Sequence, residues 1–137
     1  SFMPADGEWK IEFLPTVAST LYTVGALLCN DGTNNTISTT SSLRQIGICA
    51  QAKPTTDTTT NAIPVWIPRS ADAQMFGDVG SGTPAVANIG KTCDIASLGL
   101  TAAINTDSHH QLVISGYISA TKALFKLNSK VSTLNAA

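Results

Sequence analysis

Residues 112–127 read LVISGYISATKALFKL, and this stretch decides the fold class of the chain. Apolar residues alternate with polar ones on both sides of a short turn at residues 119–121. The alternating apolar positions are Leu112, Ile114, Ile118, Ala123, Phe125 and Leu127. A period of two places such residues on one face of a pleated strand. The stretch therefore predicts a β-hairpin that covers a hydrophobic core.

The same alternation extends the prediction to the rest of the chain. It recurs in Trp9–Leu14 and Leu43–Ala52, while Ala62–Pro68 is strand-like but contains two prolines. Because proline lacks the ladder donor, Ala62–Pro68 is predicted to be an edge strand or a strand interrupted by a bulge. Gly77–Gly82 has no Gly-Lys-Ser/Thr ending and is predicted to be a glycine-rich turn. Roughly eight short strands separated by turn signals predict an all-β fold, a single compact β-sandwich or β-barrel.

The N-terminus is predicted to differ from the body of the domain. Residues 1–8 are expected to form an extended N-terminal arm, and residues 9–137 a single β domain. The arm carries Phe2, Met3 and Pro4 and has no evident strand partner. An apolar tip in water is unfavourable, so these three residues are the candidates for protein binding, in a groove of a partner. A frayed terminus is the alternative.

Composition narrows the function classes. Only 12% of the 137 residues are charged, while Thr and Ser are abundant. Such a surface loses little side-chain entropy when it is covered, which suits a permanent assembly and also an ordinary low-charge β domain. The net charge of −1 and the scattered basic residues argue against nucleic-acid binding. No apolar stretch is long enough for a membrane span, so no membrane partner is expected.

Residues with reactive side chains are few. Cys29, Cys49 and Cys93 are odd in number and show no CxxC spacing, which predicts buried, reduced thiols, with one disulfide plus a free thiol as the alternative. His109 and His110 would point to opposite faces of a strand, but on a loop they could bind a metal together with Asp107. The preferred interpretation is a polar loop tip.

No pair of side chains is spaced for catalysis. The two glutamates, Glu8 and Glu12, lie in a segment predicted to be extended, and Asp31 and Asp57 are best explained as turn formers. The sequence therefore predicts a protein that is not an enzyme, with no catalytic residue, no metal, no cofactor and no small-molecule substrate.

The order of segments carries a family resemblance. Tyr22-Thr23-Val24-Gly25 precedes an apolar strand with a following Asp-Gly turn, and then come Ile46–Ala50, Val65–Pro68 and Ile89–Ile95 before the closing hairpin. In this layout, from Thr16 to Leu127, the chain resembles the small head decoration (cement) proteins of tailed bacteriophages.

The resemblance implies a virion structural protein that binds the outside of the phage head and stabilises contacts between major capsid subunits. It implies a homotrimer, the major capsid protein as partner, and a location on the capsid surface after assembly in the host cytoplasm. The alternative is a carbohydrate-binding or host-attachment module of a phage fibre or secreted adhesin, which an exposed cluster of Trp66, Tyr22 and Tyr117 would favour. A small hydrolase would need His109 or His110 beside a nucleophile.

Overall fold

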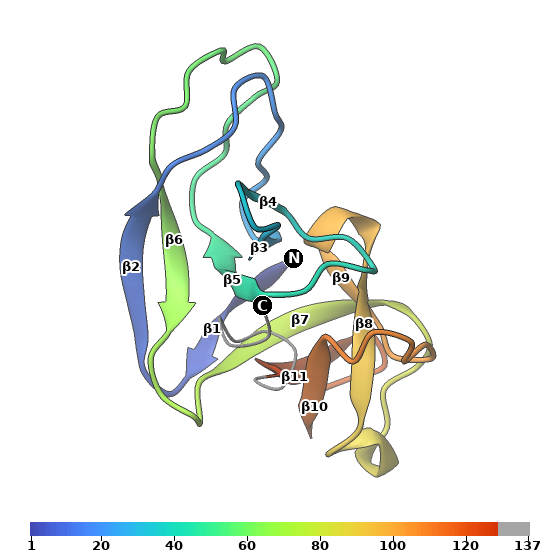
Figure 1. Cartoon of the computed structure of the whole chain (residues 1–137). Coiled ribbons are helices and arrows are strands. Elements are labelled where there is room, and N and C mark those ends of the chain that lie inside the picture. Colours follow the sequence, from blue (N-terminus) through green and yellow to red (C-terminus); the bar gives the residue numbers. More distant parts are fainter. Residues whose placement is uncertain (129–137) are drawn as a thin grey trace.

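Two β-sheets, one of them closed into a barrel, form the fold in a computed structural model that describes residues 1–128 (Figure 1). The predicted all-β class is confirmed. The described residues form eleven strands rather than about eight, together with two short 3-10 turns, η1 (Val86–Asn88) and η2 (Ser97–Gly99). Within residues 1–128 there is no helix with the length and apolar character to cross a membrane. Residues 129–137, the end of the predicted domain, lie outside the described residues.

The barrel is built around the predicted hairpin. Its strands, in spatial order, are β7 (Gln74–Ser81), β11 (Lys122–Leu127), β10 (Leu112–Tyr117), β8 (Thr92–Ala96) and β9 (Thr101–Ala103). Neighbours are antiparallel except at the closure, where β9 pairs in parallel with the second half of β7. The hairpin is confirmed: Leu112 lies opposite Leu127, and the alternating Ile114 and Phe125 point into the core.

The second sheet is antiparallel and packs against the barrel. Its order is β2 (Trp9–Leu14), β6 (Ile63–Pro68), β5 (Gln45–Cys49), β3 (Leu27–Asn30) and β4 (Asn35–Ile37). Leu27 and Ile48 join the barrel core, whereas their neighbours Leu28 and Cys49 join a second core with Tyr22 on the other face. Successive buried residues thus serve opposite faces, which explains why β3 is a continuous apolar run.

The N-terminal segment is a strand of the barrel sheet and not a free arm. β1 (Phe2–Asp6) pairs antiparallel with the first half of β7, and Phe2 lies opposite Gly77. Phe2 is only 2% exposed and meets Phe125 edge-on at 5.9 Å. The expectation that residues 1–8 lack a strand partner is therefore wrong. Its reason is physical: the partner strand lies about 70 residues away in the chain, and local sequence does not reveal it.

Two further expectations are corrected. β6 is an interior strand without a bulge, between β2 and β5. It tolerates its prolines because the β5–β6 ladder covers only Val65 and Trp66, so the missing donors of Pro64 and Pro68 fall just outside it. The stretch Gly77–Gly82 is largely strand and not a turn. At Gly77 a Cβ atom would lie 2.5 Å from the Phe2 ring, so glycine is needed for the close approach of β1.

Candidate functional site

Four titratable side chains, Asp94, Asp107, His109 and His110, lie where the loop before β10 folds back on β8. Asp94 on β8 is 1% exposed, and its carboxylate accepts backbone N–H groups from Ser108, His109 and His110 at 3.0, 2.8 and 3.2 Å. Hydrogen bonds from three successive amides stabilise a buried carboxylate charge. Asp94 therefore fixes the conformation of this loop.

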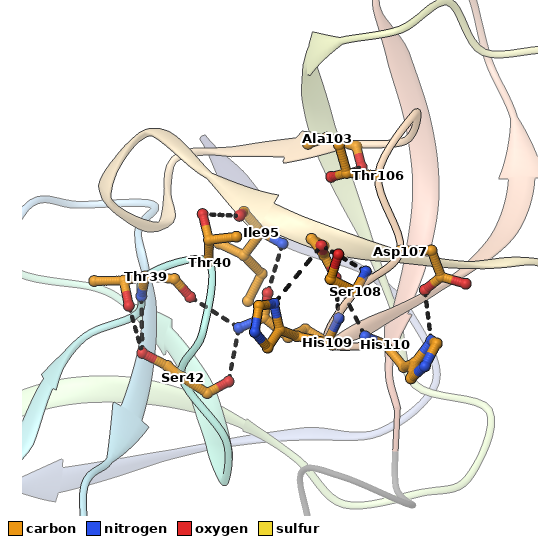
Figure 2. A network of polar contacts seen from close by, with 12 residues as sticks. Thr39, Thr40, Ser42, Ile95, Ala103, Thr106, Asp107, Ser108, His109 and His110 are labelled. Atoms are coloured by element: carbon orange, nitrogen blue, oxygen red, sulfur yellow. Dashed lines mark hydrogen bonds and ion pairs between the residues drawn. The ribbon is translucent and has the colours of Figure 1, made fainter.

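Gln111 connects the same loop to the second sheet's side of the molecule. Its side chain is fully buried, accepts the amide of Ile95 at 2.8 Å, and donates to the carbonyls of Thr39 and Ser42 at 2.8 and 2.7 Å. Thr40 adds a hydrogen bond to the Ile95 carbonyl at 3.1 Å. Figure 2 shows the loop at residues 39–42 and the loop at 106–110 meeting beside β8. This polar network joins two segments that are distant in sequence.

The two histidines are divided between two carboxylates. His110 Nδ1 lies 2.7 Å from Asp107 Oδ1, while His109 Nδ1 lies 3.9 Å from Asp94 Oδ2 (Figure 2). Thr92 donates its hydroxyl proton to Asp107 at 2.7–2.8 Å, so the hydroxyl sits at the carboxylate and not at the outer nitrogen of His110. A serine-type triad needs the nucleophile at that outer nitrogen. The same hydroxyl lies 3.3 Å from His110 Nδ1, the nitrogen that faces Asp107. Within residues 1–128 the arrangement orients the imidazole but brings no hydroxyl into hydrogen-bond contact with its outer nitrogen.

The described part of the chain contains no cluster of side chains suited to bind a metal ion. Within residues 1–128, no three His, Cys, Asp or Glu side chains are arranged to hold an ion. The loop that could have gathered His109, His110 and Asp107 instead directs the first histidine toward Asp94.

The three cysteines are free and buried, as predicted. Burial, with a smaller contribution from the nearby Asp107 and Asp94 charges, raises the pKa of the Cys93 thiol to about 12. Burial also raises the pKa of Cys49, whose thiol donates to the Gln51 carbonyl at 3.1 Å. A thiol must ionise to act as a nucleophile, so these two side chains are inert at neutral pH.

A groove opens between the two sheets, with a volume of about 810 Å³. Among its described lining residues, Glu12 is the single carboxylate, and it binds Arg69 directly. A glycosidase places two carboxylates about the scissile bond. Glu8, the other glutamate, does not line this groove. The described lining therefore lacks that pair.

Several remaining candidates have structural roles. Asp31 accepts the amides of Thr33 and Asn34, which confirms its interpretation as a turn former. Tyr22 is buried, and its hydroxyl donates to the Asn35 carbonyl while accepting the Val17 amide. With Tyr22 inside, no exposed cluster of Trp66, Tyr22 and Tyr117 forms.

The outer wall of the barrel carries an apolar row that sequence reasoning missed. Met3 on β1 lies opposite Phe76 on β7, and Phe76 lies opposite Leu124 on β11, so the three side chains share the outward face. Met3 is 59% and Phe76 40% exposed, while Leu124 is half-buried. We call these three residues the barrel row. The signal in the sequence was the alternation of Phe76 with the inward Met75 and Gly77.

Of the three predicted protein-binding residues, the structure leaves one fully on the surface. Phe2 is in the core, Pro4 is half-buried, and Met3 belongs to the barrel row. In comparisons with known proteins, no family model, curated protein or solved structure matches the chain.

Proposed function

We propose that the chain is a virion structural protein, a capsid decoration or cement protein that binds the outside of a phage head and stabilises contacts between major capsid subunits. The observation that carries the proposal is the barrel row, in which Met3 and Phe76 present large apolar side chains on adjacent strands. Contiguous exposed apolar residues on a folded domain mark interaction surfaces more often than isolated ones do.

Two further features support a docking role. The wall under the row is rigid, because β7 is hydrogen-bonded on both sides, to β1 and β9 along one edge and to β11 along the other. A rigid surface loses little conformational entropy on binding. Lys122 on β11 and Asp78 on β7 form an ion pair at 2.6 Å and supply a polar rim next to the barrel row.

The test is binding to heads of the phage that encodes the chain, prepared without it. The protein should co-sediment with these heads to a fixed stoichiometry and raise the temperature at which they rupture. Phe76→Glu should weaken binding about tenfold or more, because a charge would be buried in the contact. Val86→Glu is the matched control, since Val86 is another exposed apolar residue that lies outside the row. Both variants should keep the wild-type circular dichroism spectrum.

Two results would contradict the proposal. One is the absence of saturable head binding by the folded wild-type protein. The other is equal loss of binding in Phe76→Glu and Val86→Glu. Binding to a glycan array without binding to heads would instead support the carbohydrate-binding alternative.

A further inference from the structure

The first strand of the second sheet, β2, has an open edge. β2 is the terminal strand of the order β2-β6-β5-β3-β4, and its six residues pair with β6 without a bulge. It lies at the outer margin of the molecule in Figure 1. Ile11 and Phe13 on this strand are 42% and 68% exposed. A regular edge strand with exposed apolar side chains is a template for pairing with another strand.

The two prolines of β6 establish which backbone groups of β2 face outward. Pro64 and Pro68 lie opposite Phe13 and Trp9 and carry no N–H. The carbonyl of Pro64 accepts from Ala50, on the side of β6 away from β2, and the carbonyl of Glu8 accepts from Arg69 at 2.8 Å.

Hydrogen-bonding positions alternate along an antiparallel strand. Counting in steps of two from Glu8, the backbone groups of Lys10 and Glu12 point toward β6. The backbone groups of Trp9, Ile11 and Phe13 therefore point toward the open edge.

We propose that the occupant of this edge is β2 of a second copy of the chain, antiparallel about a two-fold axis at Ile11. In this register each outward residue meets an outward residue: Ile11 lies opposite Ile11 of the second copy, and Trp9 opposite its Phe13. By symmetry the Trp9–Phe13 pair occurs twice, so the edge has three hydrogen-bonded residue pairs, and each pair exchanges two backbone hydrogen bonds, six in all. The pairing joins the two five-stranded sheets into one continuous sheet.

Charge complementarity selects this register. With the axis at Ile11, Lys10 of each copy lies opposite Glu12 of the other at the closely spaced positions. Within each chain Glu12 already binds Arg69 and lies 3.8 Å from Lys10, so the two pairs across the axis extend an existing cluster of opposite charges. Moving the axis by one residue also aligns the outward groups but places Lys10 opposite Lys10, or Glu12 opposite Glu12. Like charges directly opposite each other are unfavourable. Of the three registers compared, with the axis at Lys10, Ile11 or Glu12, the one centred on Ile11 pairs Lys10 with Glu12.

This inference stands apart from the proposed function, and the two-fold dimer it proposes differs from the homotrimer expected from sequence. Sedimentation-velocity ultracentrifugation of the wild-type protein should show a species of twice the 14.2 kDa chain mass. Ile11→Pro should sediment as a folded monomer, because the missing N–H faces outward and the β2–β6 ladder keeps its bonds. Ile11→Val, which retains the N–H and the branched side chain, should remain dimeric.

A charge-reversal pair tests the register without altering the backbone. Lys10→Glu and Glu12→Lys should each raise the dimer dissociation constant about tenfold or more, because both cross-strand pairs become like-charged. An equimolar mixture of the two variants should form heterodimers, in which both pairs are again opposite in charge. A monomeric or trimeric wild type would overturn the proposal. So would a dimer that persists in Ile11→Pro, or two charge variants that do not associate on mixing.

Discussion

Replacing Phe2 by alanine tests whether the N-terminus is part of the core. Phe2 is 2% exposed, packs edge-on against Phe125 and fills the space above Gly77. Truncating a buried phenylalanine costs about 3–5 kcal/mol of unfolding free energy, through lost burial and the cavity left behind. The aromatic pair accounts for about 0.5–1.5 kcal/mol of this loss. The melting temperature should fall by about 10 °C or more.

The assay is equilibrium urea unfolding followed by circular dichroism. Met3→Ala is the matched control, because Met3 is the next residue on the same strand and faces outward. The Met3→Ala variant should stay within about 0.5 kcal/mol of the wild type. Equal, small effects of Phe2→Ala and Met3→Ala would refute the reasoning and restore the free arm.

A double-mutant cycle locates the contact more sharply. Gly77→Ala should destabilise the protein, since the added Cβ would lie 2.5 Å from the Phe2 ring and 2.9 Å from the Phe125 ring. In the Phe2→Ala background the first clash disappears, so the second substitution should cost less. A coupling of about 0.5 kcal/mol or more is expected for residues in direct contact. Strict additivity would place Phe2 away from Gly77.

Three further predictions concern buried and paired charges. Lys53→Met should lower the unfolding free energy, measured by urea denaturation, by about 1–3 kcal/mol, because the buried Nζ donates to the carbonyls of Val17 and Asp57 at 3.1 and 3.3 Å. An unchanged urea midpoint would contradict this prediction. The raised pKa of Cys93 contributes stability that is complete below the ordinary thiol pKa of 9.0 and is lost as pH rises toward about 12. Cys93→Ala should therefore flatten the decline of unfolding free energy between about pH 9 and 10.5, by up to about 1.4 kcal/mol per pH unit, and an unaltered slope would exclude the effect. The hydrogen bond from Lys122 lowers the pKa of Asp78, so the stabilising contribution of this carboxylate is present above about pH 4 and is lost as pH falls further. Asp78→Asn should thus cost at most about 1 kcal/mol at pH 7 and less in high salt or at pH 2, since the pair is exposed.

The elements that the sequence predicted well are those with local signals. The hairpin Leu112–Leu127 and the strand Trp9–Leu14 alternate with a period of two, and each pairs with a single regular register or one bulge. The turn at Asp31 was predicted from the Asp-Gly dipeptide at residues 31 and 32, and in the structure the Asp31 side chain accepts the amides two and three residues ahead.

The elements that were missed depend on distant partners. The parallel β7–β9 pairing closes the barrel, and the sequence of neither strand indicates that the other is its partner. Gly77 was assigned to a turn because glycine is common in turns. In the structure, glycine is needed at this position because the Phe2 ring, from a strand far away in the chain, packs against it. Pro64 argued against an interior strand, but its missing donor matters only where the neighbouring ladder extends that far.

The candidate site likewise has features that the sequence predicted and features that it did not. The prediction of a polar loop around His109 and His110 followed from local composition, and the structure shows that loop. The roles of Asp94 and Gln111 could not be predicted, because each acts on segments that only the fold brings together. The barrel row likewise needs three strands in register before Met3 and Phe76 become neighbours.

The dimer edge and the barrel row lie on different sheets, which makes their contributions separable. The edge is formed by β2, and the row by β1, β7 and β11, so pairing of two copies leaves both rows without a change in their own strands. A dimer therefore presents two docking rows, and simultaneous engagement of two sites raises apparent affinity without any new contact. Ile11→Pro should weaken head binding about tenfold or more through lost avidity, although it leaves Met3 and Phe76 in place. Phe76→Glu should weaken head binding while the protein still sediments as a dimer. Equally tight head binding by the monomer and the dimer would show that each chain docks alone. A monomeric Phe76→Glu variant would show that the barrel row also takes part in dimer formation.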